Sequence, residues 1–139
     1  MKNYISFLVL IMLVYTSCTS QLEKEDLIGA YKSSPLNLTE KIKYNTNKDI
    51  EGFLLNLKTN GLFHYDTCGL LVDGYWEVVR DSLVLNAITI KFANDSINKI
   101  KKPKKRKDFL IFKIEGKSLI GFINETNGLR INKLKRVEK

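Results

Sequence analysis

Residues 52–67, GFLLNLKTNGLFHYDT, decide the fold. On either side of the Asn60–Gly61 dipeptide, apolar and polar residues alternate with a period of two, which is typical of β-strands buried on one face. A two-residue turn at this dipeptide would pair Leu57 with His64. A three-residue loop that ends on a left-handed glycine pairs Leu57 with Phe63 instead. Because a slip of one residue moves every side chain to the opposite face, the apolar pattern predicts the three-residue loop.

A second hairpin follows the same pattern further along the chain. A two-residue loop at Arg80–Asp81 places four apolar side chains on one face, in the pairs Val78 with Leu83 and Trp76 with Leu85. Beyond these residues the alternation continues with the opposite parity, at Ile88, Ile90 and Phe92. This change predicts a bulge or a turn near Asn86 and Ala87.

Further short strands are predicted between turn residues, at residues 28–31, 108–114, 117–123 and 129–134. The chain has almost no helical pattern, and we expect an all-β fold: an antiparallel meander of eight or nine strands. Closure of the meander into a barrel removes the exposed strand edges. The long connection over residues 33–50 is the exception, because residues 38–44 can form one or two helical turns. A connection of this length is usually a functional loop or a lid.

Three motifs between residues 27 and 85 resemble those of the lipocalin-like small lipoproteins of bacteria. Residues 27–31 (LIGAY) resemble the opening Gly-x-Trp strand of that family, with Tyr31 in place of the tryptophan. Residues 57–63 resemble its Asn/Asp-Gly hairpin, and residues 74–85 resemble its Gly-x-Trp hairpin. The resemblance implies an eight-stranded barrel that holds a ligand or a partner, and it carries no catalytic residues over.

The N-terminus has the layout of a signal peptide. An apolar run of 11 residues, Ile5 to Tyr15, follows a short positive start. A transmembrane helix needs about 20 apolar residues, so this run is too short to be one. Small residues then precede Cys18, and the arrangement resembles the lipobox of bacterial lipoproteins. This resemblance implies that Cys18 becomes the first mature residue and carries acyl chains such as palmitate.

These observations divide the chain into three parts. Residues 1–17 are predicted to be a lipoprotein signal peptide, residues 18–26 the lipidated cysteine and a polar tether, and residues 27–139 a single barrel domain. We expect a lipid-anchored protein of the bacterial cell envelope, in the outer membrane. Two alternatives remain open: a conventional signal peptide cut nearby, and a disulfide between Cys18 and Cys68 in an unlipidated form.

The net charge of +8 comes from one short segment. The chain has 23 Lys and Arg against 15 Asp and Glu. Apart from Lys2 and the run at residues 99–107 (KIKKPKKRK), the basic and acidic residues balance. The seven charges of this cationic run are Lys99, Lys101, Lys102, Lys104, Lys105, Arg106 and Lys107. The run predicts contact with anionic lipid or polysaccharide, or else it is a solvated loop. Nucleic acid is not expected, because an exported protein does not meet it and no aromatic residues interrupt the run.

The candidate chemistry of the chain is sparse. There is one histidine and no Gly-x-Ser-x-Gly motif, so we expect no enzyme and no cofactor. His64, Asp66 and Cys68 recur at every second residue and are weak candidates for a metal site. Against this, side chains on one strand face point in parallel rather than converging. A solvated strand face explains the same pattern.

Four aromatic residues are expected in the barrel interior: Tyr31, Phe63, Tyr65 and Trp76. They either line a cavity for an apolar ligand or fill the core of a small barrel. The sequence therefore favours a membrane-anchored, non-catalytic barrel that binds a hydrophobic small molecule or an envelope component. The alternative is an envelope immunity or inhibitor protein that acts by binding another protein.

Overall fold

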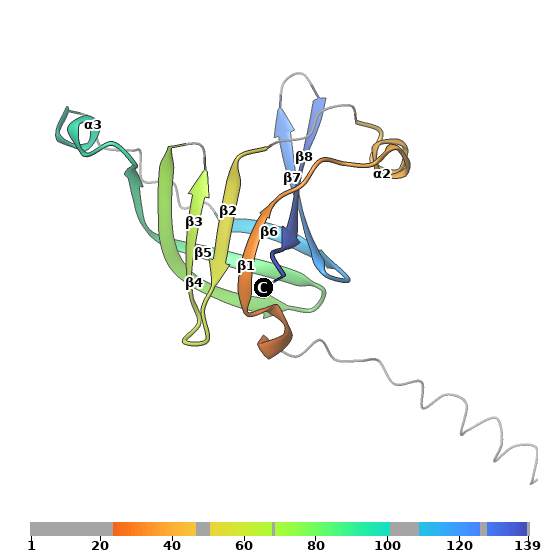
Figure 1. Ribbon diagram of the computed structural model, residues 1–139, viewed down its shortest axis with the longest axis horizontal. Helices are drawn as coiled ribbons and strands as arrows, with labels where there is room; N and C mark the ends of the chain where they lie inside the picture. Colours follow the sequence, from red (N-terminus) through yellow and green to blue (C-terminus); the bar gives the residue numbers. More distant parts are fainter. Residues whose placement is uncertain (1–23, 47–50, 68, 101–108, 126–127, 139) are drawn as a thin grey trace, which may run out of the picture.

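The computed structural model describes residues 24–46, 51–67, 69–100, 109–125 and 128–138 (Figure 1). In these ranges eight antiparallel strands form a closed barrel, in which each strand pairs with the next and β8 pairs with β1. The prediction of an all-β meander that closes into a barrel is confirmed. The strands are β1 (Gly29–Ser33), β2 (Phe53–Leu57), β3 (Leu62–Thr67), β4 (Leu70–Val79), β5 (Ser82–Phe92), β6 (Phe109–Glu115), β7 (Ser118–Glu125) and β8 (Gly128–Arg136).

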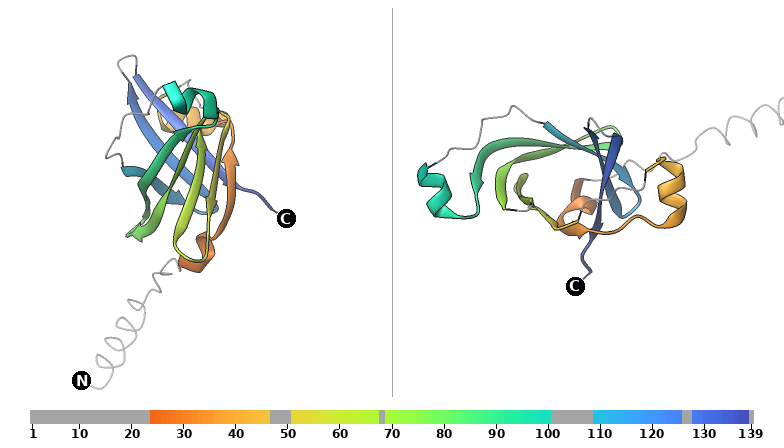
Figure 2. Two further views of the ribbon diagram at one scale, coloured as in Figure 1. Left: turned by 90° about the vertical axis from the view of Figure 1, so that its left-hand side faces the viewer. Right: turned by 90° about the horizontal axis from the view of Figure 1, so that it is seen from above.

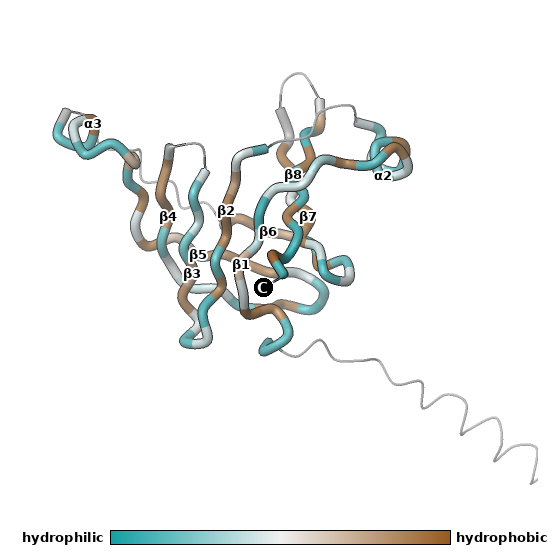
Figure 3. Tube along the Cα trace, in the orientation of Figure 1, coloured by the Kyte–Doolittle hydropathy of each residue, from teal (hydrophilic) through white to brown (hydrophobic). Residues whose placement is uncertain are grey.

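Both hairpins have the predicted register. Leu57 faces Phe63 across β2 and β3, and Gly61 ends the three-residue loop with a left-handed φ of 77°. Across β4 and β5, Trp76 faces Leu85. Apolar residues therefore recur on one face of each strand, and the alternation is visible along the chain in Figure 3. The local pattern of the sequence was sufficient to set these registers, because turn and alternation agree.

The predicted bulge lies in β5. Asp73 faces Thr89, whereas its neighbour Gly74 faces Ala87, so Ile88 is the extra residue. Gly74 allows the close approach of the two strands here, since a Cβ at this position would lie 1.9 Å from the backbone oxygen of Asn86. The extra residue reverses the alternation along β5, so that apolar side chains of its second half again point toward the barrel interior.

The main core fills the barrel between its strands. All four aromatic residues expected in the interior are buried there. They pack with aliphatic residues from β2, β5, β7 and β8 and with residues of the N-terminal turn. The remaining members of this cluster are Leu27, Leu55, Leu57, Val72, Leu83, Leu85, Phe112, Leu119 and Leu134.

A short 3-10 helix, η1 (Lys24–Leu27), lies at one end of the barrel (Figure 1). Leu27 is buried in the core, and its carbonyl oxygen accepts a hydrogen bond from the Tyr31 hydroxyl at 2.8 Å. Lys24 places its Nζ 4.7 Å from the centre of the Trp76 ring. Residues 24–26 were predicted to belong to the tether. They join the folded domain because the turn they form carries Leu27 into the core.

The connection between β1 and β2 contains the predicted helical turns, as α2 (Leu38–Lys43). Asn37 caps this helix in a capping box with Glu40. The described part of the connection does not lie over the barrel as a lid. It lies beside β7 and β8 (Figure 2). There Leu36 forms a second small core with Ile120 and Ile131 on the outer face of these strands. Residues 47–50 lie outside the described residues.

Polar contacts fix α2 to the barrel wall. Lys133 of β8 is only 5% exposed and forms an ion pair with Glu40. Partial burial alone would raise the pKa of Glu40, but the hydrogen bond and charge of Lys133, with the backbone N–H of Asn37, hold that pKa below its usual value. At the other end of α2, Lys43 donates to Glu115 at 3.0 Å. The part of the outer face of β7 and β8 around Ile120, Ile131 and Lys133 is therefore buried beneath this connection.

A second short helix, α3 (Asp95–Ile100), follows β5 and was not predicted. Asn98 holds it to the end of the strand, because its side chain accepts from the Phe92 N–H at 2.8 Å and donates to the Phe92 carbonyl at 2.7 Å. No helix within the described ranges is long and apolar enough to cross a membrane. The predicted signal peptide, Cys18 and most of the tether lie outside the described residues.

Candidate ligand pocket in the barrel wall

The wall of the barrel opens between β6 and β7. These strands share four residue pairs, from Glu115 with Ser118 to Phe112 with Gly121. Before Phe112, β6 stays paired with β5, and after Gly121, β7 stays paired with β8. Within the described residues the two strands share no further pair, so they separate at this point. A pocket occupies the place where they part.

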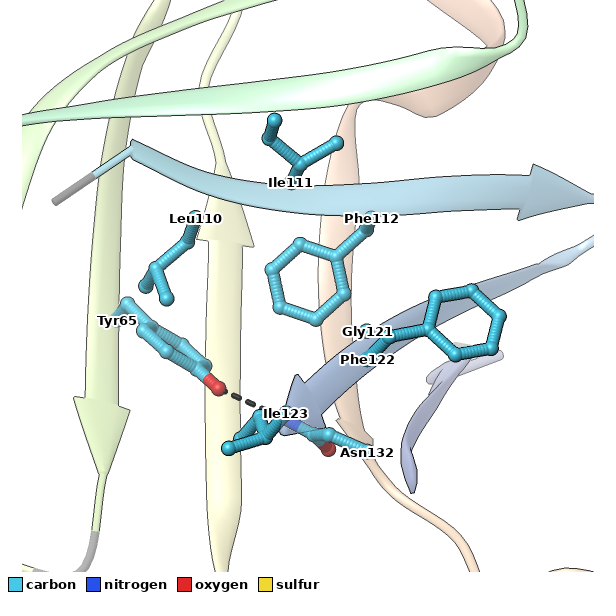
Figure 4. Close-up of a pocket in the computed structure, with 8 residues that line it drawn as sticks. All are labelled: Tyr65, Leu110, Ile111, Phe112, Gly121, Phe122, Ile123 and Asn132. Atoms are coloured by element: carbon cyan, nitrogen blue, oxygen red, sulfur yellow. Dashed lines mark hydrogen bonds between the residues drawn. The ribbon is translucent and has the colours of Figure 1, made fainter. Parts of the chain in front are cut away.

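The pocket has a volume of about 230 Å³ and reaches into the barrel interior. Leu110 and Phe112 of β6 point into it, and Tyr65 of β3 approaches from the opposite wall (Figure 4). Ile111 lies on the other side of β6. None of the lining side chains carries a formal charge. The complete lining is Tyr65, Leu110, Ile111, Phe112, Gly121, Phe122, Ile123 and Asn132.

Aromatic contacts set the shape of the inner wall. The rings of Tyr65 and Phe112 meet edge to face, with centroids 6.1 Å apart and planes at 87°. Phe53 stacks on Tyr65, with ring centroids 5.7 Å apart. Gly121 makes room for the Phe112 ring, since a Cβ at this position would lie 2.9 Å from its Cε1 atom. Such pairs are directional, so the inner wall is largely pre-formed.

One polar side chain is buried among these apolar groups. Asn132 of β8 is 2% exposed, and its Nδ2 donates to the Tyr65 hydroxyl at 2.8 Å. Its Oδ1 is also buried, and it has no hydrogen-bond partner among the described residues. A buried acceptor without a donor costs about 1–3 kcal/mol, so such an atom in a native fold needs an explanation.

The predicted interior residues divide between the pocket and the packed end of the barrel. Tyr65 lines the pocket. Tyr31 and Trp76 contact η1, and Phe63 lies beside Gly74 at the β5 bulge. The other seven lining residues, among them Phe112, Gly121 and Asn132, were not singled out from the sequence. For Asn132 the available signal was a polar residue within a buried strand. Because both faces of β8 are buried, the sequence pattern did not show that Asn132 points into the barrel.

The metal candidates do not form a cluster in the described structure. The Nδ1 of His64 lies 2.7 Å from Oδ1 of its cross-strand neighbour Asp73, and both side chains are half-exposed. Asp66 faces Leu71 instead. In the described part of the chain, no three His, Cys, Asp or Glu side chains come together as metal ligands do. Cys68 lies outside the described residues.

Of the seven charges in the cationic run, only Lys99 lies within the described residues, in the last turn of α3, where it is exposed. Lys101, Lys102, Lys104, Lys105, Arg106 and Lys107 lie outside the described residues. The run connects α3 to β6, the strand that forms one side of the pocket opening.

No protein-family model, curated protein or solved structure shows significant similarity to this chain. The interpretation of the pocket therefore depends on its geometry and chemistry.

Proposed function

We propose that the protein is a lipid-anchored envelope protein whose barrel binds a small, mainly apolar molecule without transforming it. The observation that carries this proposal is the pocket between β6 and β7, whose apolar and aromatic lining surrounds one buried amide. Binding sites for small molecules usually combine these features. An inhibitor that acts through its outer surface needs no such internal space, so the pocket favours the binding barrel over the immunity alternative.

The volume of the pocket limits the size of the bound group. An apolar cavity of about 150 Å³ holds benzene, and pockets for drug-sized ligands begin at about 300 Å³. The volume of about 230 Å³ lies between these values. By proportion it accommodates roughly nine non-hydrogen atoms. The ligand is therefore a single small ring or a short chain, or the end of a longer molecule that continues through the wall.

The lipid anchor sets the orientation of the barrel relative to the membrane. With acyl chains on Cys18, only residues 19–23 separate the anchor from η1, and an extended chain of this length spans roughly 20 Å. The η1 end then lies near the bilayer. The helices α2 and α3, the end of β7 and the start of β8 lie toward the opposite end (Figure 1). In this orientation they face away from the membrane.

Two cysteine variants test the anchor. The chain has two cysteines, so Cys68→Ser is a matched control for Cys18→Ser. Expressed in a bacterium that processes lipoproteins, the wild type and Cys68→Ser remain in the membrane fraction with acylated N-terminal peptides. Cys18→Ser loses both the acyl mass and the membrane association. An unmodified N-terminal peptide in the wild type would refute the anchor.

Native mass spectrometry tests the binding function. The full chain is extracted from its membrane in mild detergent, and the bound species are released by collisional activation. We expect a population that carries a small molecule in addition to the acyl chains. Chain that carries no added mass after extraction, and that takes up none of a panel of small apolar compounds, would refute a ligand-binding role.

A further inference from the structure

We infer that the pocket recognises a neutral hydroxyl group, carried on a small aromatic or aliphatic molecule, through the side-chain amide of Asn132. This inference rests on the proposed binding function and specifies its ligand class. The hydroxyl lies inside the barrel, at the Tyr65–Asn132 pair, and the apolar remainder extends toward the opening between β6 and β7. The following features of the pocket lead to it.

The first feature is the unsatisfied amide. Asn132 Oδ1 is the single buried side-chain atom without a hydrogen-bond partner in the described part of the chain. The amide lines the pocket, and its other end is already used by the Tyr65 hydroxyl. A ligand that donates a hydrogen bond satisfies the remaining atom, whereas a purely apolar ligand leaves it unpaired.

The second feature is that Oδ1 is fully buried in this structure. A ligand reaches the amide when it rotates about χ2, a torsion with a broad range in asparagine, and the Tyr65 hydroxyl can pair with either end of the rotated amide because it both donates and accepts. A hydroxyl suits the amide in either orientation, because it can donate to Oδ1 or accept from Nδ2. Groups that only donate or only accept match one orientation. The amide therefore favours a hydroxyl over a ketone or an ether.

The third feature is the absence of charge. None of the pocket-lining residues is Lys, Arg, His, Asp or Glu. A carboxylate or an ammonium group at the Asn132 end would lose its hydration without gaining a counter-ion, which is strongly unfavourable. The pocket therefore rejects the charged end of a fatty acid, although it accepts the hydrocarbon.

The fourth feature is the apolar rim of the opening. Ile123 is 38% exposed at the opening, and Ile111 (57%) and Phe122 (45%) border it from the outer face of the wall. Isolated exposed apolar residues are common, but three beside one opening give an apolar path from the pocket to the surface. A ligand longer than about nine non-hydrogen atoms contacts these side chains as it leaves the wall.

Matched probes test the inference on the full chain in lipid nanodiscs, with the signal of empty nanodiscs subtracted. The probes are 4-ethylphenol, its isostere 4-ethyltoluene, and charged 4-ethylbenzoate, each titrated calorimetrically. The variant is Asn132→Leu, which keeps the side-chain size and removes the amide. Asn56→Leu makes the same change on the exposed outer face of β2 and is the control. If Asn132→Leu does not fold, as judged by circular dichroism, Asn132→Ser takes its place.

The measured quantity is the preference for 4-ethylphenol over 4-ethyltoluene, expressed as the ratio of their Kd values. Because this ratio is compared between protein variants, partitioning of the probes into the lipid cancels. We expect this preference to fall about tenfold in the Asn132 variant and to stay unchanged in Asn56→Leu. We also expect 4-ethylbenzoate to bind the wild type at least tenfold more weakly than 4-ethylphenol. If both neutral probes bind with the same preference in all three proteins, the hydroxyl inference is wrong and the binding function stands. If no probe binds the wild type, both the hydroxyl inference and the proposed binding function are wrong.

Discussion

The ion pair between the buried Lys133 and the partly buried Glu40 gives a quantitative prediction. Glu40→Gln removes the negative charge and keeps the side-chain oxygen that completes the capping box with Asn37. Lys133 is 5% exposed, and Glu40 is the partner of its ammonium group. A buried charge left without its partner costs 3–5 kcal/mol, and α2 can relieve part of this by moving outward. We therefore expect a loss of about 3 kcal/mol, or about 10 °C in Tm for a domain of this size.

Thermal unfolding at pH 7 measures this loss, with Glu138→Gln as the control. Glu138 pairs with Lys117 at 3.5 Å, but both side chains are more than 80% exposed, so its replacement changes Tm by 2 °C at most, roughly the effect of an exposed pair. The pKa of Glu40 is lowered in the folded chain. Its contribution is thus complete above the ordinary value of 4.5 and is lost as the pH falls through the lowered value. Equal Tm changes in the two variants would refute the contribution of this ion pair.

Three further predictions concern the bulge, the cationic run and the metal candidates. Gly74→Ala destabilises the barrel by at least about 3 kcal/mol in urea unfolding, because the new methyl group overlaps the Asn86 backbone oxygen. A loss below about 1 kcal/mol would show that the β5 backbone can move away from the methyl group. Replacement of the seven basic residues at 99–107 by Gln and Ser weakens binding to anionic liposomes, at about 1 kcal/mol per charge near the surface; unchanged sedimentation with the liposomes would leave the run a solvated loop. Addition of Zn²⁺ or Cu²⁺ leaves Tm unchanged, because His64 pairs with Asp73 whereas Asp66 faces Leu71. A rise in Tm would show that these residues bind metal after all.

The parts of the fold that the sequence predicted are those with local causes. The hairpin at Gly61 combines alternating strands with a residue that adopts positive φ at no cost, and only one register satisfies both. The bulge at Ile88 was visible as a change of parity within one strand. The helical turns predicted over residues 38–44 form as α2, and the structure adds that they begin at a local capping box of Asn37 and Glu40.

The position of α2 could not be predicted in the same way. Its packing depends on Leu36 meeting Ile120 and Ile131, residues more than eighty positions away in the chain. Once covered, β8 is buried on both faces, so the alternation of apolar and polar residues no longer shows which side faces the core. Ile131 lies beneath the connection and Asn132 faces the interior, the reverse of what hydrophobicity alone indicates.

The pocket depends on a feature that no single segment encodes. It exists because β6 follows β5 and β7 follows β8 beyond the four pairs that the two strands share. The sequences of β6 (FLIFKIE) and β7 (SLIGFINE) are largely apolar and do not mark the point where the two strands part. The separation depends on how the twisted sheet closes into a barrel. Of the residues around it, Tyr65 was singled out by its aromatic ring, and Asn132 was not.

A blocked pocket tests the ligand-binding account most directly. Ile123→Trp places a large side chain at the partly exposed rim, and Leu54→Trp makes a similar change on the outer face of β2, at a similarly exposed residue. Binding of 4-ethylphenol is titrated for both variants and the wild type under one set of conditions. We predict that Ile123→Trp weakens binding at least tenfold and that Leu54→Trp leaves it unchanged. Equal affinities in all three proteins would contradict the assignment of the ligand to the barrel wall.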